Sequence, residues 1–319
     1  MDILVMCPAN VATGGPETLH KLVSDLNRFT DIDAKILYRG MGSGNPQPES
    51  YKIYNAPYIT EFPMGYRGAV IVPEIWAHDI LDQKYTSCTK AIFWLSVDNY
   101  RNRLRNKTEE GLFLKDPNIL HIAQSFYTEE YLGGLGAKHI IPLQEPVNDI
   151  FFEDYEEDAR EDTILYNPAK MTAFEEELID YAEIRYKFQF EPLSGCTVRQ
   201  VADKLRHHKL YIDFGPFPGR ERIPREAVLS GCCLITGKNG ASQYFKDIPI
   251  LNKYKFDTKS TAAIDVIQRM NDILTNYSTC RKDFDYFRQV LREEKRELYN
   301  KIRNLKGELD AIQHNHTSI

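Results

Sequence analysis

The sequence predicts an α/β protein made of two Rossmann-like, doubly wound domains and a long C-terminal helix. Short apolar runs alternate with helix-like segments along most of the 319 residues, which is typical of parallel sheets covered by helices. An acidic stretch interrupts this alternation once, and the same alternation then begins again. A chain of this length has room for two domains of ordinary size.

The first half contains six apolar runs with the length of buried strands. They are residues 3–6, 34–38, 69–72, 91–95, 119–123 and 139–143. The first helix is predicted to begin at Pro16, because apolar side chains then recur on one helical face. Those side chains are Leu19, Leu22, Val23 and Leu26. Another helix is predicted over residues 126–135, ending at Gly136.

The second half repeats this pattern after residues 151–162, whose seven carboxylates cannot bury enough apolar surface to form a core. Its predicted strands are residues 163–166, 188–192, 210–212 and 233–235. A helix between the first two begins with Thr172 and Glu175 in capping-box spacing, and Phe174, Leu178 and Ala182 form its inner stripe. We expect a first domain at 1–146, an acidic linker at 147–162, a second domain at 163–280 and a helix with a tail at 281–319.

The C-terminal helix has apolar residues in the 4-3 spacing of a coiled coil. They are Leu291, Leu298, Ile302, Leu305, Leu309 and Ile312. Glu294 and Lys295 occupy the place where this pattern needs another apolar residue. Two interpretations remain open: the helix packs back across the domains, or it joins two copies of the chain in a homodimer.

Composition and charge exclude several classes of function. A net charge of −6 argues against broad nucleic-acid binding. The six cysteines include no CxxC pair, which favours reduced thiols in a cytoplasmic protein. The first residues lack the basic segment of a signal peptide, and no apolar run approaches the roughly 20 residues that span a membrane. We therefore expect a cytoplasmic protein with no integral membrane segment.

The segment from Tyr211 to Ala241 carries the strongest functional signal. A short strand enters a basic loop rich in Gly and Pro, and a helix predicted to begin at Pro224 ends before Gly231. The loop is predicted to carry Arg220, Arg222 and Arg225, with Glu226 in the first turn of the helix. Guanidinium groups beside the free amides of a helix start form a site for phosphate, and Glu226 is then suited to ribose hydroxyls. The segment predicts a nucleotide-diphosphate site.

This strand–loop–helix resembles the donor-binding segment of GT-B-fold glycosyltransferases. The resemblance implies two domains that face a cleft, with the acceptor in the first and the nucleotide-sugar in the second. It makes Glu226 the ribose ligand and Arg220 or Arg222 the phosphate ligand. Retaining families often carry a second Glu eight residues before the first, where this chain has Pro218, so retention or inversion cannot be inferred. Residues 145–152 also resemble the interdomain linker of the family.

Two further loops follow predicted strands of the second half. Lys170 matches a basic residue that neutralises the leaving diphosphate in related enzymes, although Asn167-Pro168 is also an ordinary turn signal. The turn at residues 237–242 lacks the P-loop pattern, which argues against ATP hydrolysis. The backbone amides of Gly240 and Ala241 are nevertheless predicted to meet the diphosphate.

The loops of the first half supply the remaining candidates. Gly14 and Gly15 let a ligand approach the backbone, and without GxGxxG they do not indicate a dinucleotide. Glu74 and Asp98 follow predicted strands, so either is a candidate general base if the enzyme inverts. His20 lies one turn into the first helix and is a weaker catalytic candidate, since a lone His is more often structural.

No metal site is predicted. The two DxD strings, at 31–33 and 283–285, lie in a turn and in the terminal helix, away from where a GT-A enzyme holds its metal. His207 and His208 have no companion ligands at zinc spacing. Basic residues and helix dipoles are expected to replace a cation at the diphosphate.

The predicted function is therefore metal-independent transfer of a sugar from a nucleotide-sugar donor to a glycan, lipid-linked or other hydroxyl acceptor, with no cofactor besides the donor. A nucleotide-sugar epimerase of similar fold is one alternative. A non-catalytic scaffold that dimerises through its C-terminal helix is another. The sequence identifies neither the sugar nor the acceptor.

Overall fold

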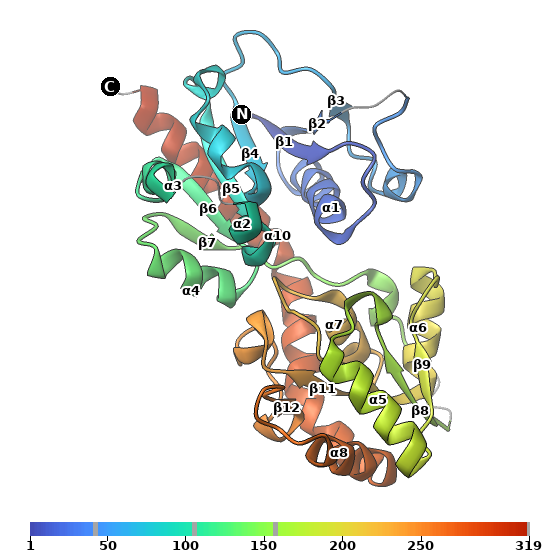
Figure 1. The fold of residues 1–319 in the computed structure, drawn as a ribbon. Helices are drawn as coiled ribbons and strands as arrows, with labels where there is room; N and C mark the ends of the chain where they lie inside the picture. Colours follow the sequence, from blue (N-terminus) through green and yellow to red (C-terminus); the bar gives the residue numbers. More distant parts are fainter. Residues whose placement is uncertain (41–43, 104–106, 156–158, 318–319) are drawn as a thin grey trace. The chain divides into compact units, whose positions relative to one another are not determined.

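The computed structural model describes residues 1–40, 44–103, 107–155 and 159–317 (Figure 1). The chain divides into two compact units. The first comprises Met1–Glu145 and the end of the chain from Glu297 onward, and the second comprises Pro146–Arg296. Each unit contains its own parallel sheet with helices, so the predicted α/β class with two doubly wound sheets is confirmed.

The described part of the first unit contains a seven-stranded sheet in the order β3-β2-β1-β4-β5-β6-β7. The strands are β1 (Asp2–Pro8), β2 (Asp33–Arg39), β3 (Tyr58–Ile59), β4 (Ala69–Pro73), β5 (Thr89–Trp94), β6 (Ile119–Ala123) and β7 (Ile140–Pro142). All six predicted strands are present. The short edge strand β3 was not predicted, because two residues form no apolar run. The strand order reverses between β1 and β4, and ligands bind beyond the carboxyl ends of the strands at such a point.

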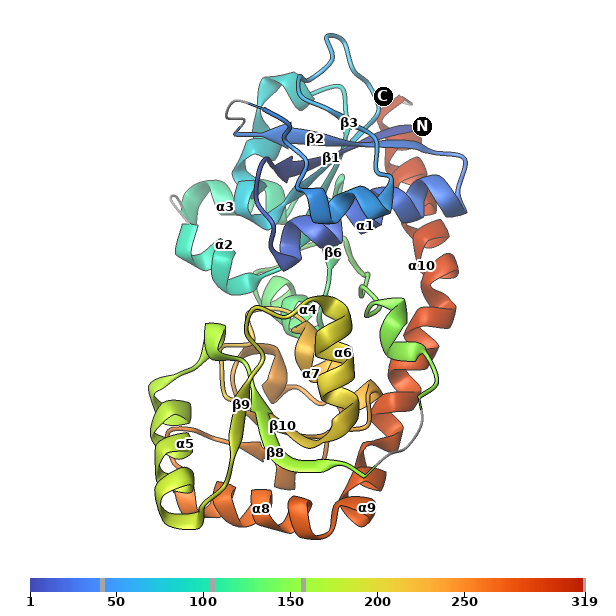
Figure 2. The same ribbon diagram turned by 90° about the vertical axis from the view of Figure 1, so that its right-hand side faces the viewer.

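Both faces of this sheet are covered. One face packs against α1 (Gly14–Phe29) and the C-terminal half of α10 (Asp285–Thr317), which run along it in Figure 2. The other face packs against η2 (Glu74–Leu81) and the short helices, which are α2 (Val97–Arg103), α3 (Lys107–Leu114) and α4 (Phe126–Gly134). Helix α1 begins two residues before the predicted Pro16, so Gly14 and Gly15 form its first turn.

The second unit has a five-stranded parallel sheet within its described residues, in the order β12-β11-β10-β8-β9. The strands are β8 (Glu161–Tyr166), β9 (Phe190–Pro192), β10 (His208–Asp213), β11 (Cys233–Gly237) and β12 (Lys255–Phe256). The order reverses between β8 and β10. Strand β8 begins at Glu161, so the last two residues assigned to the acidic linker belong to the sheet.

The helices of this unit are α5 (Ala173–Tyr186), α6 (Val198–His207), α7 (Arg222–Leu229), α8 (Ala263–Thr275) and α9 (Tyr277–Cys280). Helix α7 begins at Arg222, two residues before the predicted Pro224, and Gly231 follows it with a φ of +91°. The capping box of α5 is half formed. Thr172 accepts a hydrogen bond from the Glu175 amide, but the Glu175 carboxylate accepts from the Phe214 amide instead of closing the box.

Helix α10 explains the break in its own apolar pattern. Its buried apolar residues after the break join the core of the first unit; they are Ile302, Leu305, Leu309 and Ile312. At the break, in the second unit, Glu294 pairs with Arg220 and Lys295 pairs with Asp149 at 3.0 Å. The helix therefore packs back onto its own chain, and its buried apolar face offers no surface to a second copy. None of the described helices is both long and apolar enough to cross a membrane.

Replacement of Leu305 by Ala should lower the free energy of unfolding by about 2–5 kcal/mol, because it removes a fully buried side chain and leaves a cavity. The measurement is the urea midpoint of the full chain. Leu112→Ala is the matched control, since that side chain is 62% exposed. If both variants unfold at the same urea concentration, the helix is not anchored in this core.

Candidate functional site

Three loops meet at the carboxyl edge of the second sheet. They follow β8, β10 and β11, and side-chain and backbone hydrogen bonds join the last two. Asn239 Nδ2 donates to the carbonyl oxygens of Phe214 and Gly215, at 3.1 and 3.3 Å. The Ala241 amide donates to the Phe217 carbonyl at 2.8 Å. The edge is therefore a connected surface built from segments that are distant in sequence.

Lys170 lies at the switch point of this edge, in the loop after β8, and forms an ion pair with Glu221, which directly precedes α7. The Lys170 side chain is 34% exposed. Gly215 lets the backbone at Lys170 come close to the loop after β10, since a Cβ at position 215 would stand 2.9 Å from the Lys170 carbonyl oxygen. An arriving phosphate would compete with Glu221 for the ammonium group. No local sequence pattern pairs Lys170 with Glu221, because the two residues are 51 positions apart.

Arg220 does not lie at the surface, where a phosphate ligand was predicted. Its side chain is only 2% exposed and is ion-paired with Glu294 of α10. Its Nε and Nη1 have no hydrogen-bond partner among the described residues. Buried in this way, Arg220 tethers the loop to α10 instead of presenting a guanidinium at the surface. Arg225, also predicted to be in the loop, is a buried helical residue that donates to the Glu221 and Arg220 carbonyls.

The other residues of this unit that were predicted to bind the donor also differ from the prediction in position or contacts. Arg222 is the half-buried first residue of α7, and Glu226 lies one turn later and is 8% exposed, so Glu226 is not in the first turn as predicted. Gly240 has a φ of +48°, and a Cβ there would lie 2.0 Å from the Phe217 carbonyl oxygen. This glycine is therefore required by the backbone. The Ala241 amide is already donated to Phe217, which contradicts its predicted contact with the diphosphate.

Two buried carboxyl groups at the same edge, Glu175 and Asp213, were not predicted as site residues. Burial raises the pKa of Glu175 to about 8, with a further contribution from the Asp213 charge. Burial likewise raises the pKa of Asp213 to about 6, although the Gly215 amide hydrogen bond opposes the shift. Asp213 ends an apolar strand, so the strand-end rule could have found it. The capping-box spacing predicts only a capping role for Glu175.

In the first unit, Glu74 follows β4 at the switch point of the sheet. The residue is 3% exposed, and its Oε2 accepts a hydrogen bond from the Leu95 amide at 3.1 Å. Burial raises the pKa of this carboxyl to about 7, although the hydrogen bond opposes the shift. A carboxyl that titrates near neutral pH can both take up and release a proton there, as a general base requires. Asp98, in the first turn of α2, is half-buried and accepts from Tyr127 Oη at 3.3 Å.

His20 is a core residue, which argues against its predicted catalytic role. The ring is fully buried, with Nδ1 2.7 Å from the Pro16 carbonyl and Nε2 2.6 Å from Tyr38 Oη. Burial lowers the pKa of His20. Both ring nitrogens are thus engaged within the fold. Of the two predicted glycines, Gly14 is exposed and Gly15 is half-buried, and a Cβ at Gly15 would make an ordinary 3.6 Å contact with Leu95.

Within the described part of the chain, no group of three or more His, Cys, Asp or Glu side chains is arranged to hold a metal ion. Both DxD strings are engaged elsewhere. Asp33 begins β2 and pairs with Lys35, and Asp283 accepts from Tyr254 Oη at 2.7 Å.

The fold of this chain is similar to the folds of several solved proteins, among them sugar-transferring enzymes. Neither a protein-family model nor a curated protein sequence matches the chain. Sucrose-phosphate synthase from Thermosynechococcus elongatus superposes with a TM-score of 0.69 at 11% identity, over 97% of this chain and 99% of its own. Anabaena HepE, solved with UDP and glucose, gives 0.68 at 11%, over 98% and 100%. BGT from T4 phage, solved with UDP and Mn²⁺, gives 0.51 at 10%, over 97% and 100%.

The raised pKa of Glu74 makes stability depend on pH. The folded pKa of about 7 lies above the 4.5 of an exposed glutamate, so protonation of Glu74 favours the folded state. This stabilisation is complete below about pH 4.5 and is lost as the pH rises through 7. Glu74→Gln stays neutral and can still accept from Leu95. Relative to wild type, the variant should gain on the order of 3 kcal/mol of stability between pH 4.5 and 8.

Urea unfolding at several pH values checks this expectation. Glu49→Gln provides the control, because the Glu49 side chain is 85% exposed and its removal should have the same effect at every pH. A constant difference between Glu74→Gln and wild type would show that Glu74 does not titrate in this range.

Proposed function

We propose that the protein transfers a sugar from a nucleotide-sugar donor to a hydroxyl group of a glycan or lipid-linked acceptor. The observation that carries the proposal is the whole-chain similarity to glycosyltransferases solved with UDP, together with a partly exposed lysine at the switch point of the second sheet. Identity near 11% supports the fold alone, so the chemistry rests on the residues at the two sheet edges.

The second unit binds the donor in this proposal. Charge on the diphosphate grows as its bond to the sugar breaks, and a fixed cation stabilises that charge most in the transition state. Lys170 supplies the cation once phosphate has displaced Glu221, and Arg222 lies at the start of the adjacent helix. Glu226 receives the ribose hydroxyls. Arg220 contributes indirectly, by tying the loop to α10.

The first unit binds the acceptor. Glu74 is our preferred general base, because its carboxyl changes protonation near neutral pH and lies at the switch point of the sheet. Asp98 is the alternative base, since it is more exposed and follows the neighbouring strand. Gly14 and Gly15 provide a helix start that the acceptor or the donor phosphates can approach.

Substitutions in the Lys170–Glu221 pair are expected to change the affinity for UDP in opposite directions. Glu221→Gln should tighten UDP binding, because the carboxylate no longer competes for the ammonium group. Lys170→Ala combined with Glu221→Gln should weaken UDP binding by about tenfold or more, the loss of a charge-assisted hydrogen bond, without leaving an unpaired carboxylate. Both affinities are measured by calorimetric titration of UDP into the full chain.

Lys204→Ala is the matched control for the lysine. That side chain is 31% exposed and is also paired with a glutamate, Glu191, but it lies in α6, away from the carboxyl edge. Its UDP affinity should stay within about threefold of wild type. If UDP binds folded wild type and all three variants equally, the diphosphate does not lie at this edge. Failure of UDP and other nucleoside diphosphates to bind wild type would remove the proposed function itself.

Transfer should also survive EDTA, since lysine, arginine and helix dipoles take the part of a divalent cation here. The measurement is release of nucleoside diphosphate from the donor that the calorimetric screen selects, with and without EDTA, and with Mn²⁺ added back. The test matters because a protein of similar fold, T4 phage BGT, was solved with Mn²⁺ beside UDP. Loss of turnover in EDTA with recovery in Mn²⁺ would contradict metal-independent transfer.

A further inference from the structure

Asp213 is a buried acidic residue at the same edge of the second sheet as Lys170. It ends β10, and Lys170 lies in the loop after the neighbouring strand, β8. A Cβ built on Gly215 would lie 3.0 Å from Asp213 Oδ1 and 3.1 Å from Lys170 Cβ, so these two side chains border the same small space. A diphosphate bound at Lys170 would therefore lie close to the Asp213 carboxylate, and two anions repel each other most strongly where water is excluded.

Hydrogen bonds hold the Asp213 carboxyl group at both of its oxygens. Oδ1 accepts from the Gly215 amide at 3.0 Å, and Oδ2 accepts from Tyr211 Oη, also at 3.0 Å. The turn that follows is fixed as well, because Asn239 Nδ2 donates to the carbonyl oxygens of Phe214 and Gly215. The carboxyl group cannot turn away from an arriving anion without breaking these bonds. It can lose its charge and keep them, since a protonated carboxyl group still accepts at one oxygen and exchanges a hydrogen bond at the other.

Titratable side chains from four segments act on the charge of Asp213. Burial raises its pKa to about 6, and the charge of Glu221, which precedes α7, adds to this shift. The amide hydrogen bond, the Tyr211 hydroxyl group and the Lys170 ammonium group act in the opposite direction. Burial and the Asp213 charge raise the pKa of Glu175, in α5, to about 8. At pH 7 Asp213 is therefore mainly ionised, whereas Glu175 is mainly protonated.

A bound diphosphate changes this balance in one direction. It pairs with the Lys170 ammonium group and adds negative charge beside Asp213. A nearby cation favours the carboxylate and a nearby anion disfavours it, so both changes favour the neutral carboxyl group. Because the pKa of Asp213 in the free protein already lies just below neutral pH, a modest further rise is enough to protonate it at pH 7.

We propose that Asp213 takes up a proton when the diphosphate of the donor binds at Lys170, and that this proton determines how tightly the donor is held. The inference rests on the proposed function, because it takes the donor to the carboxyl edge of the second sheet. Asp213 is then a positioning residue, which fixes the turn at Gly215 and, once neutral, no longer repels the phosphate. The affinity for the donor rises as the pH falls from 8, and levels off below about pH 6, where Asp213 is already protonated in the free protein.

Calorimetric titration of UDP-glucose into the full chain, from about pH 6 to pH 8.5, tests this proton uptake. UDP-glucose is the probe because its diphosphate has no group that titrates in this range, whereas a terminal phosphate such as that of UDP titrates near pH 6. Wild type should bind about tenfold more tightly, or more, at the lower pH. At pH 7 the heat of binding should depend on the ionisation enthalpy of the buffer, with the sign of proton uptake.

Asp213→Asn resembles the protonated carboxyl group, since the amide can still accept from Gly215 and donate to Tyr211. This variant should bind UDP-glucose about tenfold more tightly than wild type at pH 8, with little dependence on pH and no proton uptake. A purely structural role would leave its affinity unchanged or weakened. Tyr211→Phe provides a second test, because loss of the phenol hydrogen bond raises the pKa of Asp213 and should move the pH dependence to higher pH.

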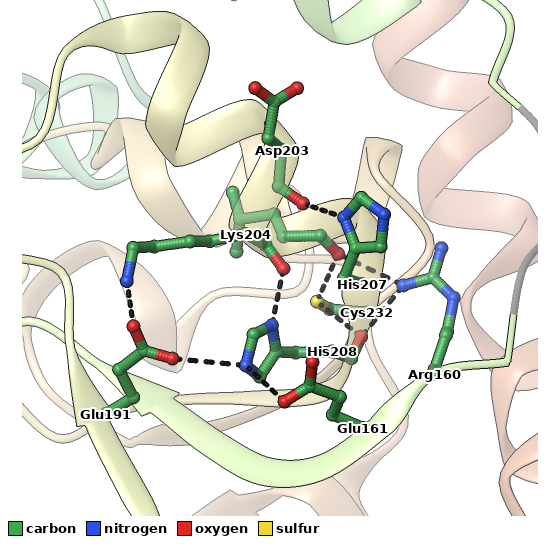
Figure 3. A network of polar contacts seen from close by, with 9 residues as sticks. Arg160, Glu161, Glu191, Asp203, Lys204, His207, His208 and Cys232 are labelled. Carbon is green, nitrogen blue, oxygen red and sulfur yellow. Dashed lines mark hydrogen bonds and ion pairs between the residues drawn. The ribbon is translucent and has the colours of Figure 1, made fainter.

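His208→Gln is the control, because His208 is another buried titratable side chain of the same unit but begins β10, at the opposite end of the sheet. Figure 3 shows its surroundings: Nδ1 lies 2.7 Å from the Lys204 carbonyl oxygen, and Nε2 lies 3.2 Å from Glu191 Oε2. This variant should keep the pH dependence and the proton uptake of wild type.

Two results would overturn the proposal: an affinity of wild type that does not change with pH, or proton uptake that persists in Asp213→Asn. If UDP binds and UDP-glucose does not, the same comparison is made with UDP above about pH 7.5, where its phosphates are ionised. Failure of both probes to bind wild type at millimolar concentration is a different outcome, because it removes the proposed function and this inference with it.

Discussion

Parallel strand pairing is the constraint on which the rest of this structure depends. The described strands of both sheets pair in parallel throughout. A parallel pair needs a crossover, usually a helix, and it directs all carboxyl ends to one edge. Glu74 therefore shares an edge with the glycines of α1, and Lys170 meets Glu221, although each pair is far apart in sequence. The reversal of strand order in each sheet then selects where on the edge a ligand is received.

At these edges the fold controls charge by burial and by pairing. Burial raises the pKa of Glu74, Glu175 and Asp213, because a carboxylate removed from water loses its hydration. Lys170 is instead ion-paired with Glu221 and retains access to solvent. Perturbed carboxyls together with an accessible cation are typical of functional sites, where a group must change its charge or its partner during the reaction.

Helix α10 serves different purposes along its length. Its first residues, with the short segment before it, line a cavity of the second unit together with Arg160 and Lys209. Farther on, Glu294 accepts from the buried Arg220 and fixes the loop that leads to α7. Beyond that, its apolar face completes the core of the first sheet. The polar residues that interrupt its coiled-coil spacing, Glu294 and Lys295, form ion pairs within the second unit, and these pairs account for the interruption.

The two α/β halves, ten of the strands, the long C-terminal helix and the strand ends of the candidate site could all be predicted from the sequence. These features depend on apolar periodicity and turn residues, which are local. Which charged side chains meet could not be predicted in this way, because it depends on how distant segments pack. Lys170 and Glu221 are 51 residues apart, and Arg220 and Glu294 are 74 apart, so no local pattern pairs them. The burial of single side chains could not be predicted from the sequence either, because it depends on every segment that packs around them. Burial gives His20 and Arg220 structural roles, and the loss of hydration raises the pKa of Glu74.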